Sequence, residues 1–372
     1  MDTEMSHTDR RYDIDWLRVI AIGLLLLYHI GIVFQPWAVF LGFLQSNEPI
    51  ESLWPPMAML NVWRIPLLFF VSGMGVCFAI RKRNWKQLII ERTRRILVPF
   101  LFGMVILVPI HVLIWQNYYH QDLRYAPHPG HLWFLGNIFI YVVLLSPLFF
   151  LMRNRQQGRV LRGLSWLFSN PLGLLLITAL FVLETLAVRP ERYAMFAFTF
   201  HGFLLGLVAF LSGFTVVITG PAFWNTVRRW RWIYLVAAVM SYMIRYLVFG
   251  LEAPGILAAA ESTFWIFSAL GFGYRYLNRP GKTLNYLSQA AYPVYILHMI
   301  FLYAGASLIL PLEIPAVFQL ILVTGITAAG CMGSYEIIRR LSFLRPLFGL
   351  KTAKKGVSFR PGGHDVIRVP QN

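Results

Sequence analysis

The sequence has few charged residues, and acidic residues are the scarcest of them. Only 13% of its 372 residues are charged, about half of the roughly 25% found in soluble domains. The 16 Asp and Glu against 33 Lys and Arg leave a formal net charge of +17. In a soluble protein that excess would indicate a nucleic-acid partner. Here 58% of the residues are hydrophobic and the basic residues lie between long apolar runs, so we expect no nucleic acid. The composition also excludes disorder, collagen-like repeats and a disulfide-rich secreted module.

Cysteine and short catalytic motifs are scarce or missing as well. The only two cysteines, Cys77 and Cys331, fall inside apolar runs and give no indication of an extracellular disulfide. The sequence contains no HExxH, paired CxxC, P-loop or GxSxG motif, so the metalloprotease, NTPase and serine-hydrolase classes lack support. The nine histidines lack the local spacing of zinc ligands, and we expect no metal.

The long apolar runs predict an all-α integral membrane protein. A helix needs about 20 apolar residues to cross a bilayer core of about 30 Å, and ten such runs occur. The first follows a charged start without a small-residue cleavage site, which predicts a retained signal-anchor. The ten predicted transmembrane helices are residues 14–34, 57–80, 96–118, 132–152, 171–187, 198–218, 233–250, 256–277, 287–310 and 315–336.

Lys and Arg are concentrated in alternate connections between these spans. The stretch 81–95 holds seven of them, and together with the other basic connections and both chain ends it accounts for 27 of the 33. By the positive-inside rule, both termini are predicted to be cytoplasmic. We predict a single membrane domain over residues 1–350. Residues 351–372 are predicted to form a basic, disordered tail at the lipid surface.

The first span carries the strongest set of polar residues. Arg18 and His29 are eleven positions apart, which is close to three turns of a helix, so both project from one face. Arg18 lies at the cytoplasmic edge, and Asp15 is placed to pair with it. Ordinary alternatives are a snorkelling arginine and a histidine that bonds another helix. Their common face favours a functional interpretation, because ionisable groups in a membrane are costly.

A second set lies in the basic stretch before the third span. Arg92 and Arg95 stand three positions apart and share a face if that helix begins early. Paired guanidinium groups suit phosphates, which they can bind at two points. The alternative is topology charge alone, which we accept for residues 81–83.

Further polar candidates lie deeper or at the outer side. His128, His131 and Trp133 mark the outer mouth of the fourth span, where His131 could act on or orient an acceptor, although Trp133 also suits an interfacial belt. His298 lies near the middle of the ninth span. The Gly and Ser of FFVSGMG in the second span predict close helix packing. The outer halves of several spans contain Arg64, His111, Glu184, His201, Arg245 and Glu261.

These motifs together resemble the acyltransferase-3 family of membrane acyltransferases. DWLRVIAIGLLLLYH, with ten residues between Arg18 and His29, is similar to the family signature. RIPLLFFVSG, the arginines before Ile96, HLWFL and YPVYILH follow in the matching order. Within the family the chain is most similar to the glucan biosynthesis protein C group, which is associated with succinylation of periplasmic glucans. Glu261 and the ending YEIIRRLSFLRPLFGLK look like that group.

The resemblance implies transfer of an acyl group from cytoplasmic succinyl-CoA or acetyl-CoA to a hydroxyl of a periplasmic or envelope glycan, in a bacterial inner membrane. Arg92 and Arg95, with Arg18, would bind the CoA phosphates. His29 would be the general base or be transiently acylated. His298 and Glu261 would polarise the acceptor or the carbonyl group. A succinyl group would need a cation near its distal carboxylate, for which Arg64 and Arg245 are candidates.

Two other functions compete with this one. A transporter or exporter of glycan intermediates would also need intramembrane Arg, Glu and His residues. The paired arginines before the third span suit a nucleotide-like anion better than a neutral glycan, which favours the enzyme. The other large family of membrane-bound O-acyltransferases also uses a membrane histidine, but it gives no reason for the Arg18-to-His29 spacing.

Overall fold

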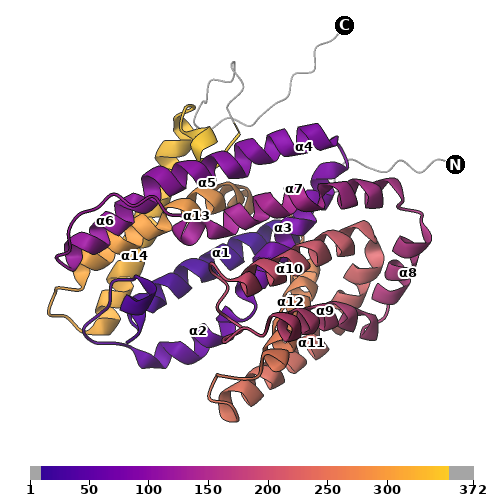
Figure 1. Cartoon of the computed structure of the whole chain (residues 1–372), viewed down its shortest axis with the longest axis horizontal. Helices are drawn as coiled ribbons and strands as arrows, with labels where there is room; N and C mark the ends of the chain where they lie inside the picture. The colour runs from indigo at the N-terminus through magenta and orange to yellow at the C-terminus, as the bar shows by residue number, and fades with distance from the viewer. Residues whose placement is uncertain (1–9, 352–372) are drawn as a thin grey trace, which may run out of the picture.

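The computed structural model describes residues 10–351, and the ordered elements of this part of the chain are helices (Figure 1). The predicted tail therefore lies outside the described residues, except for Lys351. The α-helices are α1 (Tyr12–Val33), α2 (Trp54–Asn61), α3 (Arg64–Ile80), α4 (Trp85–Arg92), α5 (Val98–Phe102), α6 (Val108–Tyr118), α7 (Trp133–Asn154), α8 (Arg159–Phe168), α9 (Leu175–Val188), α10 (Phe200–Ile218), α11 (Pro221–Leu247), α12 (Gly255–Tyr276), α13 (Lys282–Ile309) and α14 (Ala316–Arg340).

The predicted all-α membrane architecture is confirmed for the described residues. Eight helices there are long and apolar enough to cross a membrane, and α8 with residues 172–188 forms a ninth candidate that is bent by 120°. All ten predicted segments are helical, but two do not qualify alone. Helix α9 has only 14 residues, and α11, which begins at Pro221, contains the arginine-rich stretch 228–231. The number of ten transmembrane spans therefore remains a prediction.

The third span is longer than the sequence predicts. Its helix begins at Trp85, where Asn84 caps it, and continues to Tyr118. Two π-helical turns interrupt it, η3 (Thr93–Leu97) and η4 (Gly103–Leu107). Turns of this type are rare and occur often at functional sites. The first of them carries Arg95.

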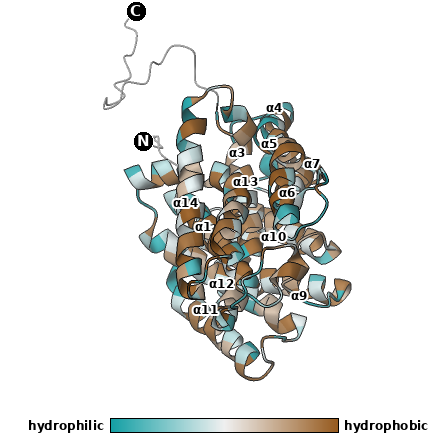
Figure 2. Cartoon of the chain, turned by 90° about the vertical axis from the view of Figure 1, so that its left-hand side faces the viewer, coloured by the Kyte–Doolittle hydropathy of each residue, from teal (hydrophilic) through white to brown (hydrophobic). Residues whose placement is uncertain are grey.

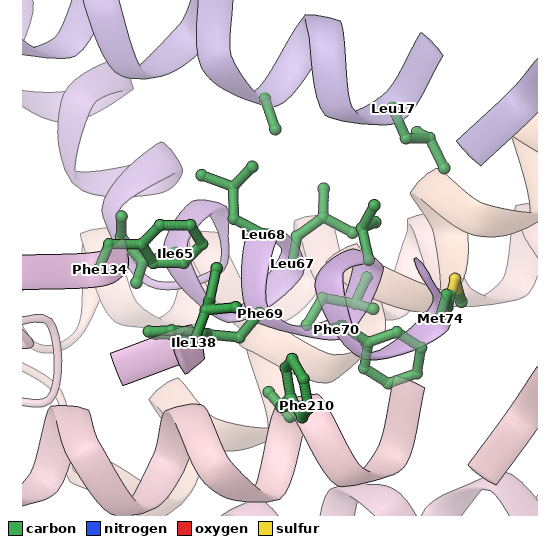
Figure 3. Close-up of a cluster of buried hydrophobic side chains, with 14 of the residues drawn as sticks. Leu17, Ile65, Leu67, Leu68, Phe69, Phe70, Met74, Phe134, Ile138 and Phe210 are labelled. Atoms are coloured by element: carbon green, nitrogen blue, oxygen red, sulfur yellow. The ribbon is translucent and has the colours of Figure 1, made fainter. Parts of the chain in front are cut away.

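Helix α3 lies inside the bundle and organises its core. Its glycines allow close contact with α10, because a Cβ added at Gly73 would overlap the carbonyl oxygen of Phe210, and one at Gly213 would overlap that of Phe70. The close packing predicted from FFVSGMG is thereby confirmed. Figure 3 shows the α3 side chains between α1 and α10, with residues of α7 beside them; the labelled members are Leu17, Ile65, Leu67, Leu68, Phe69, Phe70, Met74, Phe134, Ile138 and Phe210.

The remaining surface and the helix ends fit a membrane protein. The helices consist largely of hydrophobic residues (Figure 2), and many large apolar side chains of the described part are exposed. Several basic connections meet at one end of the bundle. Arg10 donates a hydrogen bond to Asn285, and Arg153 donates to the carbonyl oxygens of Ile80 and Arg83.

Candidate functional site

Two histidines from distant parts of the sequence meet inside the bundle. Nδ1 of His29 on α1 lies 2.8 Å from Nε2 of His298 on α13, and the rings stack at a centroid distance of 5.1 Å. Nδ1 of His298 lies 2.7 Å from the carbonyl oxygen of Tyr295, one turn earlier on α13. His298 is fully buried, whereas His29 is only partly buried. The second nitrogen of His29, Nε2, makes no hydrogen bond within residues 10–351.

His131 joins this pair from the start of α7. Its ring lies edge-on to His298, with centroids 4.9 Å apart, and its Nε2 is 3.1 Å from the carbonyl oxygen of Ile296. The hydroxyl of Tyr295 donates to the His131 carbonyl oxygen over 2.6 Å. Nδ1 of His131 is buried and has no partner among the described residues. His29, His131 and His298, all predicted site residues, therefore lie together.

The local sequence explains why His131 points inward. Gly130 has φ +49, a left-handed conformation that glycine adopts readily, and it opens the short 3-10 turn η5 (Gly130–Leu132) before α7. Its amide donates to Nδ1 of His128 over 2.9 Å. The predicted rim residue His128 thus shapes the turn and is itself exposed.

His111 is a fourth member of the group, hereafter the histidine cluster (His29, His111, His131 and His298). Its ring centroid is 5.8 Å from that of His131 and 5.0 Å from that of Tyr303, and its Nδ1 is buried without a partner in the described part of the chain. The sequence alone assigns His111 only to the outer half of a predicted span. A lone histidine in the apolar run PIHVLIW gives no more information than that.

The histidine cluster is poorly shaped for a metal ion. Zinc holds imidazole nitrogens at about 2.0–2.1 Å, so two ligand nitrogens stand further apart than the 2.8 Å between His29 and His298. Among the described residues, no group of three or more His, Cys, Asp or Glu side chains is arranged to hold a metal. Proton transfer is the chemistry that this arrangement suits.

The predicted arginines form a second group, hereafter the arginine cluster (Arg18, Arg92 and Arg95). Arg18 lies within electrostatic range of Arg95, and Arg92 lies within range of both. The predicted pairing of Asp15 with Arg18 is confirmed, at 3.5 Å. The hydroxyl of Tyr292 on α13 is buried beside Arg92 and Arg95 and has no partner within the described residues.

Nearby carboxylates neutralise the arginine cluster only in part. Asp15 also binds Arg10, at 2.9 Å. Glu91 is shared between Arg83 and Arg95, at 3.3 Å from each. Nε of Arg92 is buried without a hydrogen-bond partner in the described chain. A cluster with surplus positive charge and unused donors is suited to bind an anion with several oxygens.

Glu261 lies in a different environment from the histidines. Both of its oxygens are bound by Arg245, at 2.6 Å and 2.9 Å, and Arg245 also donates to the carbonyl oxygen of Ala58. Both side chains are almost completely buried. The pair joins α11 to α12 and leaves neither group free for a substrate.

His201 and Glu184 form a similar closed pair. Nδ1 of His201 is 3.0 Å from Glu184, and its Nε2 is 2.9 Å from the carbonyl oxygen of Tyr193. Both ring nitrogens are therefore occupied by acceptors. This pair fixes the connection between α9 and α10.

Arg64, in contrast, is buried and has no carboxylate partner within residues 10–351. Only 2% of it is exposed, its guanidinium lies 3.9 Å from the ring centroid of Tyr28, and Nε and Nη1 have no hydrogen-bond partner in the described part of the chain. An unpaired buried cation is costly. Arg64 is also within electrostatic range of His29.

Fold and site together define an integral membrane protein with a histidine cluster in its interior and a separate cationic group. Residues 11–336 match the acyltransferase domain of the acyltransferase-3 family. Because this match covers most of the chain, the protein belongs to that family and is a membrane acyltransferase. No curated protein and no solved structure matches the chain.

Proposed function

We propose that the protein is an O-acyltransferase that moves an acyl group from cytoplasmic acyl-CoA to a hydroxyl of a periplasmic or envelope glycan. The observation that carries this proposal is the pairing of His29 with His298. Nε2 of His29 then has no hydrogen-bond partner among the residues that the structure describes, and the His29 side chain is only partly buried. An imidazole with one nitrogen held and the other free is suited to act as a general base.

The donor binds, in this proposal, through the phosphates of CoA at the arginine cluster. Arg18, Arg92 and Arg95 supply surplus positive charge there, and Tyr292 adds a hydroxyl that has no partner among the described residues. Arg18 and His29 are eleven positions apart on α1, a rise of about 16 Å at 1.5 Å per residue. The extended pantetheine arm of CoA bridges this distance and brings the thioester to the histidine cluster.

The reaction then proceeds at His29. Its Nε2 removes the proton of the acceptor hydroxyl, and the oxygen attacks the thioester carbonyl. As the carbon–sulfur bond breaks, the leaving thiolate takes the proton back from His29. Transient acylation of His29 is the alternative order of events. In this proposal His131, whose buried Nδ1 lacks a partner in the described chain, accepts a hydrogen bond from a hydroxyl of the glycan.

The acyl group is proposed to be succinyl or acetyl. The two candidate cations for a distal carboxylate differ, because Arg245 is bound to Glu261, whereas Nε and Nη1 of Arg64 have no partner within residues 10–351. Arg64 therefore favours succinyl as the transferred group, because it could bind the distal carboxylate. We assign Glu261 a structural role, since its oxygens are occupied.

The resemblance to the glucan biosynthesis protein C group supports a glucan acceptor and a bacterial inner membrane. The gathering of basic connections at one end of the bundle supports cytoplasmic termini. We further propose that residues 1–350 act as one membrane domain.

The experiment uses purified protein in lipid vesicles with a panel of radiolabelled acyl-CoA donors and a glucan acceptor. Wild type is compared with His29→Ala and with His120→Ala, a histidine in an exposed loop. We expect CoA-dependent label on the glucan with wild type and His120→Ala only. Undiminished transfer by His29→Ala would remove that residue from the mechanism. Glycan uptake without any CoA dependence would show the transporter.

A further inference from the structure

We propose that His298 is a positioning residue that fixes the tautomer of His29, so that the lone pair of His29 is held on Nε2. This inference rests on the proposed function, in which His29 is the base. It assigns His298 a different task from polarising the acceptor or the thioester carbonyl. The observation that carries it is a series of two hydrogen bonds, one between the Tyr295 carbonyl oxygen and His298 and one between His298 and His29.

The Tyr295 carbonyl oxygen defines the proton positions, because a carbonyl can only accept. Nδ1 of His298, 2.7 Å away, must therefore carry a hydrogen. A neutral imidazole has a single N–H, which leaves Nε2 of His298 as an acceptor. That acceptor faces Nδ1 of His29 at 2.8 Å. His29 consequently donates from Nδ1, and its own lone pair lies on Nε2.

The surroundings keep His298 neutral. Its side chain has no exposed surface, and its ring contacts the rings of His29, His131 and Tyr295, with His111 within electrostatic range. No carboxylate within residues 10–351 bonds to it. The charged group that acts most strongly on the His29 ring is Arg64, which is a cation. A second, unpaired positive charge in this interior would be costly.

The proton balance of the reaction follows from this arrangement. Nε2 of His29 gains the hydroxyl proton while the new oxygen–carbon bond forms. Nδ1 of His29 keeps its hydrogen and continues to donate to His298, which stabilises the transient imidazolium. When the carbon–sulfur bond breaks, the proton leaves Nε2 for the thiolate. His298 gains and loses no proton, so it acts only through His29.

The closed pair of His201 and Glu184 differs from the pair of His29 and His298 in how many ring nitrogens are bonded. His201 is held at both nitrogens, by Glu184 and by the Tyr193 carbonyl. No nitrogen remains there to take a proton from a substrate. At His29 one nitrogen is held and the other is free, and the holding partner is a neutral ring.

The test compares His298→Leu, which removes the acceptor, with His298→Gln, whose side-chain oxygen can take the place of Nε2. In the vesicle assay we expect His298→Leu to lower kcat on the order of 100-fold or more, with KM for acyl-CoA within about twofold of wild type. His298→Gln should recover kcat to within about tenfold. Retention of kcat by His298→Leu, or an equal loss in both variants, would overturn the proposal.

A second measurement needs no His298 variant and no activity. Wild-type protein in nanodiscs, labelled with ¹⁵N-histidine, is examined by NMR, and the His29 signals are identified by their loss in His29→Gln. We expect Nδ1 to be protonated and Nε2 to be unprotonated. The opposite tautomer would contradict the inference even if acyl transfer occurs. If wild type transfers no acyl group, the proposed function fails, while the NMR result still decides the tautomer.

Discussion

Arg245 of α11 and Glu261 of α12 form a two-point ion pair in the interior, with Nε–Oε2 and Nη2–Oε1 distances of 2.6 and 2.9 Å. Glu261 has no exposed surface. A pair of this kind ties two helices together and leaves no free oxygen for a substrate. The histidine cluster has the opposite property, because several of its ring nitrogens have no partner in the described part of the chain.

Breaking this ion pair should therefore destabilise the protein without removing its chemistry. Glu261→Leu leaves Arg245 buried and unpaired, which costs about 3–5 kcal/mol. The double variant Arg245→Met with Glu261→Leu should recover most of the stability. Thermal unfolding in detergent measures both effects. If folded Glu261→Leu protein showed no acyl transfer, Glu261 would have a catalytic role after all.

Removal of one arginine from the arginine cluster should weaken donor binding. Arg92→Ala takes away a group that can form charge-assisted hydrogen bonds of about 1.5–3 kcal/mol. We expect KM for acyl-CoA to rise about 10- to 100-fold, and kcat to change much less. Arg94→Ala is the matched control, since Arg94 is exposed on the same turn. An equal rise in both variants would indicate only a general effect of surface charge.

Arg64 should control the choice between acyl groups. Arg64→Gln removes the unpaired cation, so transfer of a succinyl group should fall about tenfold or more relative to an acetyl group. Competition between the two labelled donors measures this ratio directly. A parallel loss for both donors would show that Arg64 supports the structure or the reaction in general.

The close approach of α3 and α10 should depend on Gly73. A methyl group there would overlap the Phe210 carbonyl oxygen, and overpacking of this kind costs about 1–3 kcal/mol. Gly325→Ala on α14 is the control, because a Cβ at Gly325 meets no atom within 4 Å. We expect a lower melting temperature for Gly73→Ala alone. Equal melting temperatures would mean that the helices move apart without cost.

Much of the fold could be predicted from the sequence, since apolar length determines where membrane helices form. Two regions were harder to predict. Helix α11 continues through the arginines at 228–231, and α9 is shortened by a sharp bend after α8. The length and hydropathy of an apolar run show neither where a helix bends nor that it continues through charged residues. The close packing at Gly73 could be predicted, because small residues in a membrane helix have few other roles.

The site could be predicted as a set of residues but not as a set of contacts. The pairing of Asp15 with Arg18 could be predicted, because a spacing of three positions on one helix places them side by side. His29 and His298 are 269 positions apart, and only tertiary packing brings them together. For the same reason the sequence could not separate Arg245, which is neutralised, from Arg64, which is not.

The most direct test of the central claim is the rate of CoA release by His29→Gln in the presence of donor and glucan. Glutamine can occupy the place of the imidazole and form hydrogen bonds, but it cannot take up a proton. With folding and KM unchanged, we predict a rate at least about 100-fold below that of wild type. A rate within about twofold of wild type would contradict the account, because His29 would then not be the base.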